Sequence, residues 1–463
     1  MDDDFRSGET AAVRVTRGVP LAEALDTGDP GAWTAFDVGV RQMLQYRRAP
    51  LPAHDLPAID TEARLALAVC HPDGRRREAA LDEAVAHPVL LPLLVVRAGD
   101  WVAPVRERAR RLLGEVLDVR AAVHLAPVIL RVGRRERGAF GIGLLEGVLR
   151  RAPRERLLPL HTHTDRIVRR FAFRLAVEGA LLSPGELARR ASWDGDTVVQ
   201  TLCADAAVAA VTGEGDWDEV LEPLLAARSP RARAAGVTAL RRAGRPGRAV
   251  EFLADRSAVV RACARYVVRR HGTDPLPWYR ERCAGPAVEP GAVIGLAECG
   301  ERADAELLWP LLAHPVPGVR ARAVAGLRTL DVADRARLSP LLDDPAPGVV
   351  RETAAALLPS AGTLPEGALL TRLGAGRPRH VRVAAFRLLD ARGGTAALRA
   401  AVALLDDPDA KLRAWAGQSV QRWHPGAGTR SGDPEVGALL DRARHLFSEH
   451  VLKRRKWEAG LPA

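Results

Sequence analysis

The chain has 463 residues, of which 47% are hydrophobic and only 4% aromatic, and its formal net charge is +11. A chain of this length is too long to fold around one ordinary hydrophobic core. Runs of β-branched and aromatic residues are scarce, which disfavours a β-sheet protein. Only three of the 68 basic residues are Lys, so 65 are Arg. Such a skew is as typical of GC-rich coding as of a polyanion-binding protein, so the charge alone does not indicate nucleic-acid binding.

Residues 1–59 are predicted to form an N-terminal helical cap. The first ten residues, MDDDFRSGET, are acidic and polar, unlike a signal peptide. Residues 20–48 predict a short helix followed by an amphipathic helix. The longest apolar run, residues 88–96, is short and broken by Pro, so no membrane partner is expected.

The five cysteines are odd in number and show no C-x-x-C spacing. This pattern favours buried, reduced thiols over a disulfide framework or a zinc site. We therefore expect a soluble cytoplasmic protein without a cofactor or metal.

Between residues 60 and 424 the chain repeats one pattern. The segments LLAHPVPGVRARAVAGL (311–327), LLDDPAPGVVRETAAALL (341–358) and LLDDPDAKLRAWAG (404–417) share a leucine pair, a turn with Pro, and a Val-Arg or Leu-Arg step. Each unit predicts two helices of about ten to twelve residues, and stacking the units buries faces that one pair cannot bury alone. The residues marking the Arg step, at intervals near 31, are Arg77, Arg106, Arg137, Arg169, Gln200, Arg231, Arg261, a degenerate unit near Ala292, Arg320, Arg351, Arg382 and Arg413.

An Asp commonly stands six residues before the marker Arg, as in Asp100–Arg106, Asp255–Arg261 and Asp407–Arg413. The pattern D-x-x-x-x-[VL]-R resembles the HEAT-repeat family in its short bacterial form. The resemblance implies an all-α fold, a right-handed α-solenoid of about twelve helical pairs, with an Asp–Arg ladder between neighbouring repeats. The ladder is expected to weaken at Arg320, Arg382 and Gln200, where the pattern is incomplete.

Residues 425–463 are predicted to cap the C-terminal end of the array. Asp433 and Pro434 suit the N-cap and first position of a helix, which we expect to run to about Trp457. Its basic end, KRRK at 453–456, suits the helix dipole better than it indicates a nucleic-acid tail.

The second helix of each repeat is expected to line the concave side of the array. Residues one, five and eight positions after the marker point away from the predicted core. These outward positions form a mixed polar row rich in Arg. The binding residues predicted from them are Arg111, Arg170, Arg174, Asp205, Tyr266, Arg269 and Arg387.

Charge is segmented along the array. Residues 131–174 hold 12 Arg and 4 acidic residues, and residues 226–282 hold 14 Arg and 4 acidic residues, whereas residues 183–222 hold 9 acidic residues and 2 Arg. Alternating patches fit a protein partner better than a smooth polyanion. Nucleic-acid binding through the two Arg-rich segments stays open. So does the simpler interpretation that these charges lie on solvent-exposed outer helices and bind nothing.

Catalytic patterns are hard to find. HTHTD at 161–165 offers metal-ligand residue types, but it occupies a repeat turn, which favours a structural role. Asp205 lies near Trp193 and Trp217 in the sequence, and HEAT-like DNA glycosylases use a concave carboxylate with aromatic neighbours, although no motif is shared. Tetrapyrrole lyase activity, known among HEAT-like proteins, has no support in the residues. The sequence therefore predicts a non-catalytic scaffold that binds a protein partner, with a nucleic-acid binder, in particular a glycosylase-like enzyme, as the alternative.

Overall fold

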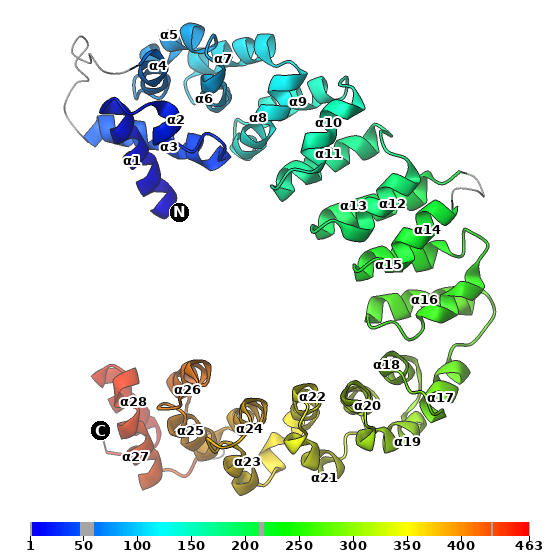
Figure 1. Cartoon of the computed structure of the whole chain (residues 1–463). Helices are drawn as coiled ribbons and strands as arrows, with labels where there is room; N and C mark the ends of the chain where they lie inside the picture. The colour runs from blue at the N-terminus through cyan, green and yellow to red at the C-terminus, as the bar shows by residue number, and fades with distance from the viewer. Residues whose placement is uncertain (1, 47–59, 213–216, 427–428, 463) are drawn as a thin grey trace. The chain divides into compact units, whose positions relative to one another are not determined.

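A computed structural model describes residues 2–46, 60–212, 217–426 and 429–462. Within these ranges every regular element is a helix (Figure 1), and the all-α solenoid expected from the sequence is confirmed. Residue contacts divide the chain into two compact units, residues 1–236 and 237–463, and each unit is a stack of helical pairs. The boundary falls within α15 (Pro230–Ala239).

Unit 1 begins with three helices and continues with helical pairs. The N-terminal helices are α1 (Asp2–Thr16), α2 (Leu21–Ala24) and α3 (Pro30–Tyr46). The first helices of the pairs are α4 (Thr61–Val69), α6 (Leu91–Arg97) with the preceding 3-10 turn η1 (Pro88–Leu90), α8 (Val119–Val132), α10 (Arg154–His161), α12 (Pro184–Trp193) and α14 (Trp217–Leu225). The second helices are α5 (Gly74–Ala84), α7 (Ala103–Val116), α9 (Ala139–Leu149), α11 (Arg166–Glu178), α13 (Thr197–Ala210) and α15.

The N-terminal region contains one helix more than the sequence predicted, α1. It packs closely on α3, because Gly8 and Gly39 carry no side chain at the crossing: a Cβ on Gly8 would lie 2.2 Å from a backbone oxygen of α3. The short helix and the amphipathic helix that were expected are α2 and α3. The rest of the predicted cap, residues 47–59, lies outside the described residues.

Unit 2 continues the alternation. Its first helices are the 3-10 turn η2 (Pro246–Phe252), α17 (Leu276–Ala284), α19 (Ala305–Leu308) between η3 (Arg302–Asp304) and η4 (Pro310–Ala313), α21 (Arg335–Leu338) with η5 (Ser339–Asp343), η6 (Leu358–Thr363) with α23 (Glu366–Arg372), and α25 (Gly394–Ala403). The second helices are α16 (Ala258–Arg270), α18 (Pro290–Cys299), α20 (Pro317–Thr329), α22 (Pro347–Leu357), α24 (Arg379–Arg392) and α26 (Ala410–Arg422).

Several first helices of unit 2 are shorter than the expected ten to twelve residues. In α19 and α21 the α-helix has four residues, and a 3-10 segment containing Pro310 or Pro340 follows. Pro removes a backbone donor and clashes with the preceding turn, which disfavours continuation of the α-helix at these two positions. The second helices are regular, and α18, α20, α22 and α24 pack in series on one side of the unit (Figure 1).

The second helices share one alignment, defined by the fourth residue of each helix. In chain order these residues are Arg77, Arg106, Ile142, Arg169, Gln200, Arg233, Arg261, Val293, Arg320, Val350, Arg382 and Arg413. The repeat expected from the sequence is therefore present, at positions close to those predicted.

Three of the predicted marker residues are wrong. Arg351 is the fifth residue of α22 and its side chain is 68% exposed, whereas the buried fourth residue is Val350. The helices α20 and α22 start 30 residues apart, at 317 and 347, so the assumed spacing of 31 slips by one. In the same way, the fourth residue of α15 is Arg233 and not Arg231, and Arg137 lies before the start of α9.

The Arg at this fourth position binds the turn that leads into its own helix. Arg77 Nη1 donates to the backbone oxygens of His71 and Pro72, both at 2.8 Å. Arg320 repeats the arrangement with His314 at 2.9 Å and Pro315 at 3.2 Å. The same contacts recur at Arg106, Arg169, Arg233 and Arg413. A guanidinium supplies enough donors to satisfy these carbonyls and still reach the next repeat.

The expected ladder is formed by the remaining guanidinium nitrogens. Arg77 Nε and Nη2 contact both Asp100 carboxylate oxygens at 3.0 and 2.9 Å, and Arg320 contacts Asp344 at 2.8 Å twice. The Asp100 carboxylate also accepts the Val102 amide at 2.9 Å, so one carboxylate serves turn and ladder as the sequence suggested. Further rungs are Arg169–Asp194 and Arg382–Asp407.

The prediction that the ladder weakens at Arg320 and Arg382 is wrong, because each pairs with the Asp of the following repeat. The absent Asp affects the preceding repeat instead. His314 and Gly376 stand in the repeats that follow α18 and α22, and the fourth residues of those helices are Val293 and Val350, which need no carboxylate. Donor and acceptor are thus missing together.

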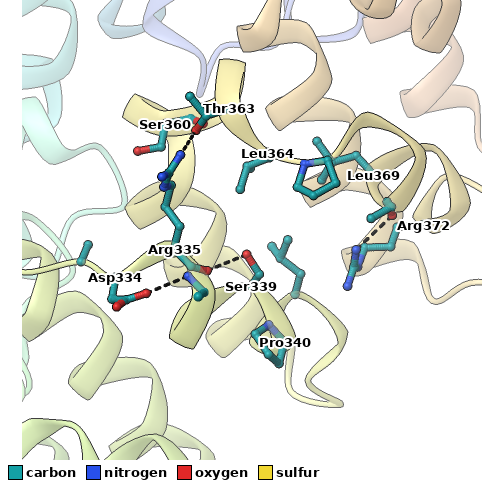
Figure 2. A pocket seen from close by; sticks show the side chains of 14 residues that line it. Asp334, Arg335, Ser339, Pro340, Ser360, Thr363, Leu364, Leu369 and Arg372 are labelled. Atoms are coloured by element: carbon teal, nitrogen blue, oxygen red, sulfur yellow. Dashed lines mark hydrogen bonds between the residues drawn. The ribbon is translucent and has the colours of Figure 1, made fainter.

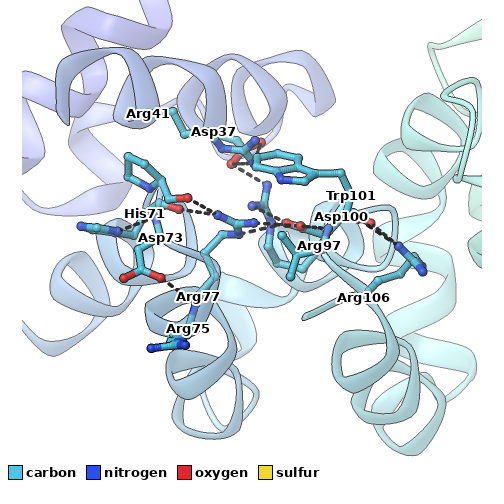
Figure 3. Close-up of polar contacts among 12 residues, drawn as sticks. Asp37, Arg41, His71, Asp73, Arg75, Arg77, Arg97, Asp100, Trp101 and Arg106 are labelled. Atoms are coloured by element: carbon cyan, nitrogen blue, oxygen red, sulfur yellow. Dashed lines mark hydrogen bonds and ion pairs between the residues drawn. The ribbon is translucent and has the colours of Figure 1, made fainter. Parts of the chain in front are cut away.

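A buried ion-pair chain links α3 to the first repeats of unit 1 (Figure 3). Arg97 contacts Asp37 at 2.5 Å and Asp100 at 2.9 Å, and Asp100 in turn binds Arg77. All four side chains are at most 3% exposed. A buried charge without a partner costs several kcal/mol, so this chain fixes how the N-terminal helices attach to the repeats.

Trp101 covers the outer side of this chain. The Arg41 and Arg77 guanidinium groups lie 4.1 and 4.4 Å from its ring centroid. Burial alone would raise the pKa of Asp37, but the charges of Arg97 and Arg41 outweigh it and hold that pKa below its usual value. Asp37 is therefore charged in the folded protein at neutral pH.

The C-terminal segment contains two helices where one was expected. Asp433 caps α27 (Pro434–Arg442) by accepting the Glu435 amide at 3.0 Å, as predicted. A short 3-10 turn, η7 (Arg444–Leu446), interrupts the segment before α28 (Glu449–Glu458). The basic residues of α28 form ion pairs, including Lys456–Asp441 at 2.7 Å, in agreement with a structural role.

Candidate binding face of the second helices

Within each of the two units, most outward positions of the second helices are accessible, and we call these positions together the second-helix face. It consists of residues one, five and eight positions after the fourth residue of each second helix. Among the described residues, grooves open on it between α11 and α13, α16 and α18, and α24 and α26, with volumes of about 360, 530 and 390 Å³. Five of the seven predicted binding residues line them: Arg170, Arg174, Tyr266, Arg269 and Arg387.

The groove between α11 and α13 is held by ion pairs. Arg170 binds Asp196 through two contacts of 2.9 and 2.8 Å, and Asp196 also accepts the Val198 amide at the start of α13. The hydrogen bond from Arg170 is the main cause that lowers the pKa of Asp196 to about 2. Arg174 contacts Glu146 of α9 at 2.5 Å. Both predicted Arg residues therefore stabilise the stack as well as lining the groove.

The groove between α24 and α26 combines apolar and polar side chains. Phe386 forms its buried side, and Trp415 of α26 is half-buried in the opposite wall. Arg387 is exposed, and no ion pair engages it among the described residues. Asp390 accepts a hydrogen bond from Ser419, which joins the two helices. The sequence did not predict Trp415, although its place two residues after Arg413 put it next to an outward position.

The groove between α16 and α18 has a polar base. Glu298 of α18 binds Arg261 and Arg265 of α16, the latter at 2.8 Å. Arg265 also donates to the Tyr279 hydroxyl at 3.5 Å, and that hydroxyl donates to the Leu253 carbonyl at 2.7 Å. Burial is the main cause that raises the pKa of Tyr279 to about 12. Neither Glu298 nor Arg265 was predicted, since Arg265 lies between the outward positions.

Two predicted residues line none of these grooves. Arg111 and Asp205 are exposed on α7 and α13. Trp193, at the end of α12, is 65% exposed and stacks under Arg190 at 4.2 Å, but Trp217 is only 7% exposed and belongs to the core of α14. Of the two aromatic neighbours considered for Asp205, only Trp193 is therefore accessible.

Stacking pairs the basic segment 131–174 with acids of later helices. Arg150 binds Glu178, and Arg154 binds Glu186. Further pairs within or from this segment are Arg169–Asp194, Arg170–Asp196 and Arg174–Glu146. Much of the charge that looks segmented in the sequence is locally neutralised on the folded surface.

The HTHTD turn is occupied by structural contacts. His161 is buried and stacks on Phe173 with ring centroids 4.7 Å apart. His163 Nδ1 accepts the Asp165 amide at 3.0 Å, and Asp165 caps α11 by accepting the Ile167 amide at 2.8 Å. Across the described ranges, no three His, Cys, Asp or Glu side chains gather as a metal site would require.

A larger groove, of about 800 Å³, lies on the opposite side of unit 2 between the first-helix segments α21–η5 and η6–α23 (Figure 2). Its polar groups have partners in the protein: Arg335 donates to Thr363, and Ser339 donates to the Arg335 carbonyl at 2.7 Å. Arg372 pairs with Asp343 of η5, which lies outside the lining. No feature singled out in the sequence predicted this groove.

Comparison with known proteins adds the following. No family model matches the sequence, and no curated protein matches it. Among solved structures, the chain is similar to Kap121p bound to RanGTP (13% identity, TM-score 0.32), covering 86% of this chain and 52% of that one. It is also similar to importin beta (13% identity, TM-score 0.33, 97% of this chain and 65% of that one) and to an engineered protein (17% identity, TM-score 0.22, 77% and 97%).

The chain thus spans between 52% and 65% of the length of these Kap121p and importin beta chains. At such identities the likeness concerns the helical fold alone. Within the described residues, no helix has the length and apolar character needed to cross a membrane.

Proposed function

We propose that this chain is a HEAT-like helical scaffold that binds a protein partner along its second-helix face. The observation that carries the proposal is the mixed chemistry of the grooves between second helices. Each combines aromatic or aliphatic side chains with charged groups, as in the groove formed by Phe386, Arg387 and Trp415. Protein interfaces favour aromatic residues and Arg at such sites.

The ladder supports the HEAT-like assignment within this proposal. Arg and Asp recur at the same places of successive helical pairs, and they bind across the repeat boundary, as at Arg320–Asp344. We also propose a cytoplasmic location, which agrees with five free thiols, of which Cys70, Cys203 and Cys283 are buried.

A nucleic-acid binder is the second candidate, because residues 226–282 keep several exposed Arg side chains, including Arg269 and Arg270. The ion pairs of segment 131–174 disfavour nucleic-acid binding. A phosphate-binding track needs unpaired Arg side chains that neutralise phosphates and so release the counterions of the nucleic acid. A glycosylase-like role would require Asp205 to act with an accessible aromatic pair, and Trp217 is buried.

Site-specific photo-crosslinking tests the proposal. A benzophenone amino acid is placed on the second-helix face at Arg111 and Arg387, and on exposed first-helix positions at Arg120 and Thr371. In nuclease-treated extract of the native host, we expect one protein adduct from Arg111 and Arg387 and none from the other two. Adducts only from Arg120 and Thr371 would contradict the assignment of the face, and adducts abolished by nuclease would support the nucleic-acid alternative.

A further inference from the structure

The groove between α16 and α18 carries an uneven distribution of charge. Arg261, Arg265 and Arg269 follow one another at intervals of four residues and so share one side of α16. Arg270 adds a fourth guanidinium at the end of the helix. Glu298, on α18, is the acidic residue that lines this groove.

The inner half of the groove is already neutralised. Glu298 binds Arg261 and Arg265, and the side chains of these two Arg residues are 3% and 11% exposed. Burial opposes ionisation of Glu298, but the hydrogen bonds from Arg261 and Arg265 outweigh it and lower its pKa. Glu298 is therefore committed to the base of the groove and is unavailable to the outer Arg residues.

The outer half carries cations without a carboxylate. Arg269 and Arg270 are exposed, and no ion pair engages either of them among the described residues. Tyr266 lines the same groove and is 44% exposed, and its ring centroid is 5.7 Å from the Arg270 guanidinium. An exposed aromatic ring next to two free guanidinium groups suits a ligand that has carboxylates and an apolar stem.

The surroundings favour a short acidic segment over a nucleic-acid backbone. Past α16, the outward positions within α18 are the buried Ile294 and the carboxylate Glu298. Those of α20 are Ala321, the buried Ala325, and Arg328, which pairs with Glu352 at 3.5 Å. A phosphate chain would meet one carboxylate and then apolar side chains, and the next Arg on its path is already paired with Glu352. It needs successive available cations instead. The positive patch of unit 2 is limited here to the end of one helix.

We propose that this groove binds a short acidic peptide segment of the protein partner, with its Asp or Glu carboxylates on Arg269 and Arg270 and an adjoining side chain over Tyr266. This assignment rests on the proposed function, of which it specifies the partner chemistry. Clusters of Arg are a general means of recognising acidic motifs.

Fluorescence polarisation tests the assignment with a labelled peptide of Asp, Glu, Leu and Gly. The full chain is titrated at physiological ionic strength, together with the same peptide in which every acid is replaced by its amide. The test variant is Arg269→Glu/Arg270→Glu. The control, Arg322→Glu/Arg377→Glu, changes the net charge equally at exposed positions of unit 2 outside the groove.

We expect the acidic peptide to bind, the amide peptide not to bind, and the test variant to lose roughly tenfold or more in affinity while the control changes less than about twofold. Circular dichroism of both variants confirms folding. No binding of the acidic peptide, equal binding of the amide peptide, equal loss in test and control variants, or tighter binding of a single-stranded oligonucleotide would overturn the assignment. Crosslinking from Arg387, in a separate groove, reports on the proposed function independently of this result.

Discussion

Arg320→Ala and Arg351→Ala are expected to differ strongly in stability, although both Arg residues follow Val in neighbouring repeats. Arg320 contacts both carboxylate oxygens of Asp344 at 2.8 Å and two carbonyls of its own turn. Among the described residues, Arg351 is paired only with its neighbour Glu352, at 3.2 Å. The two substitutions therefore separate the ladder from a surface ion pair.

The magnitude follows from burial. The Arg320 and Asp344 side chains are 13% and 6% exposed, so the substitution leaves a nearly buried carboxylate whose remaining partner is the Ala346 amide. Losing hydrogen bonds to a charged group costs about 1.5–3 kcal/mol, and breaking a fully buried pair costs about 3–5 kcal/mol. We expect roughly 2–3 kcal/mol for Arg320→Ala. Arg351→Ala should stay within about 0.5 kcal/mol, because exposed pairs contribute little.

Urea unfolding followed by circular dichroism measures the difference. Because stacked repeats can unfold in parts, hydrogen exchange of residues 340–350 is followed as well, and faster exchange is expected only for Arg320→Ala. A double-mutant cycle with Asp344→Ala should show that the two losses are not additive. Equal effects of Arg320→Ala and Arg351→Ala, or a larger effect of the latter, would refute the alignment of the second helices.

Three further outcomes are expected. Gly291→Ala should lower the thermal midpoint markedly, because the added Cβ would lie 1.8 Å from a backbone oxygen. Gly348→Ala, at the same helix position, should be neutral or stabilising, because nothing lies within 4 Å of the added Cβ. Similar midpoints for the two variants would contradict this packing. Arg170→Gln should be less stable than the wild type at neutral pH, because the lowered pKa of Asp196 stabilises the fold while its carboxylate is ionised. In acid unfolding, the difference in stability should vanish as the pH falls from 3.8 towards about 2. A difference that persists below pH 2 would exclude this cause. Asp205→Asn should change the stability by less than about 0.5 kcal/mol, and neither protein should release methylated purines from DNA; release by the wild type alone would favour the glycosylase alternative.

The sequence was sufficient for the features that depend on neighbouring residues. The fourth-position Arg of a second helix binds carbonyls five and six residues earlier, so its signature is local and repeats visibly, as at Arg320 and Arg413. The partner Asp likewise stands at a fixed distance before the next second helix. A regular interval in the sequence therefore predicted both the helical pairs and the rungs of the ladder.

Features that depend on how helices stack could not be predicted from the sequence. The Asp37–Arg97 contact joins segments separated by a stretch with no repeat to align them. The Arg154–Glu186 pair neutralises a segment that looks strongly basic when read along the chain. The loops also vary in length, which is why a constant interval of 31 residues points to Arg351, although Val350 holds the fourth position of α22.

For the grooves too, residues set by a single helix could be predicted, and contacts between two helices could not. The outward positions identified Tyr266 and Arg269 because helical geometry alone sets which residues face away from the core. Glu298 comes from the next helix, so its role in binding Arg265 depends on the packing of α16 against α18. The acidic-segment assignment rests on this contact, since it separates committed from available Arg residues.

Hydrogen exchange of the complex with the crosslinked partner tests the central claim, binding along the second-helix face, most directly. The free chain and the complex are compared peptide by peptide by mass spectrometry. We predict slower exchange in peptides from second helices, above all α16 and α24, and unchanged exchange in the first-helix segments α21 and α23. Protection confined to α21 and α23, around the groove between the first helices, would contradict the account.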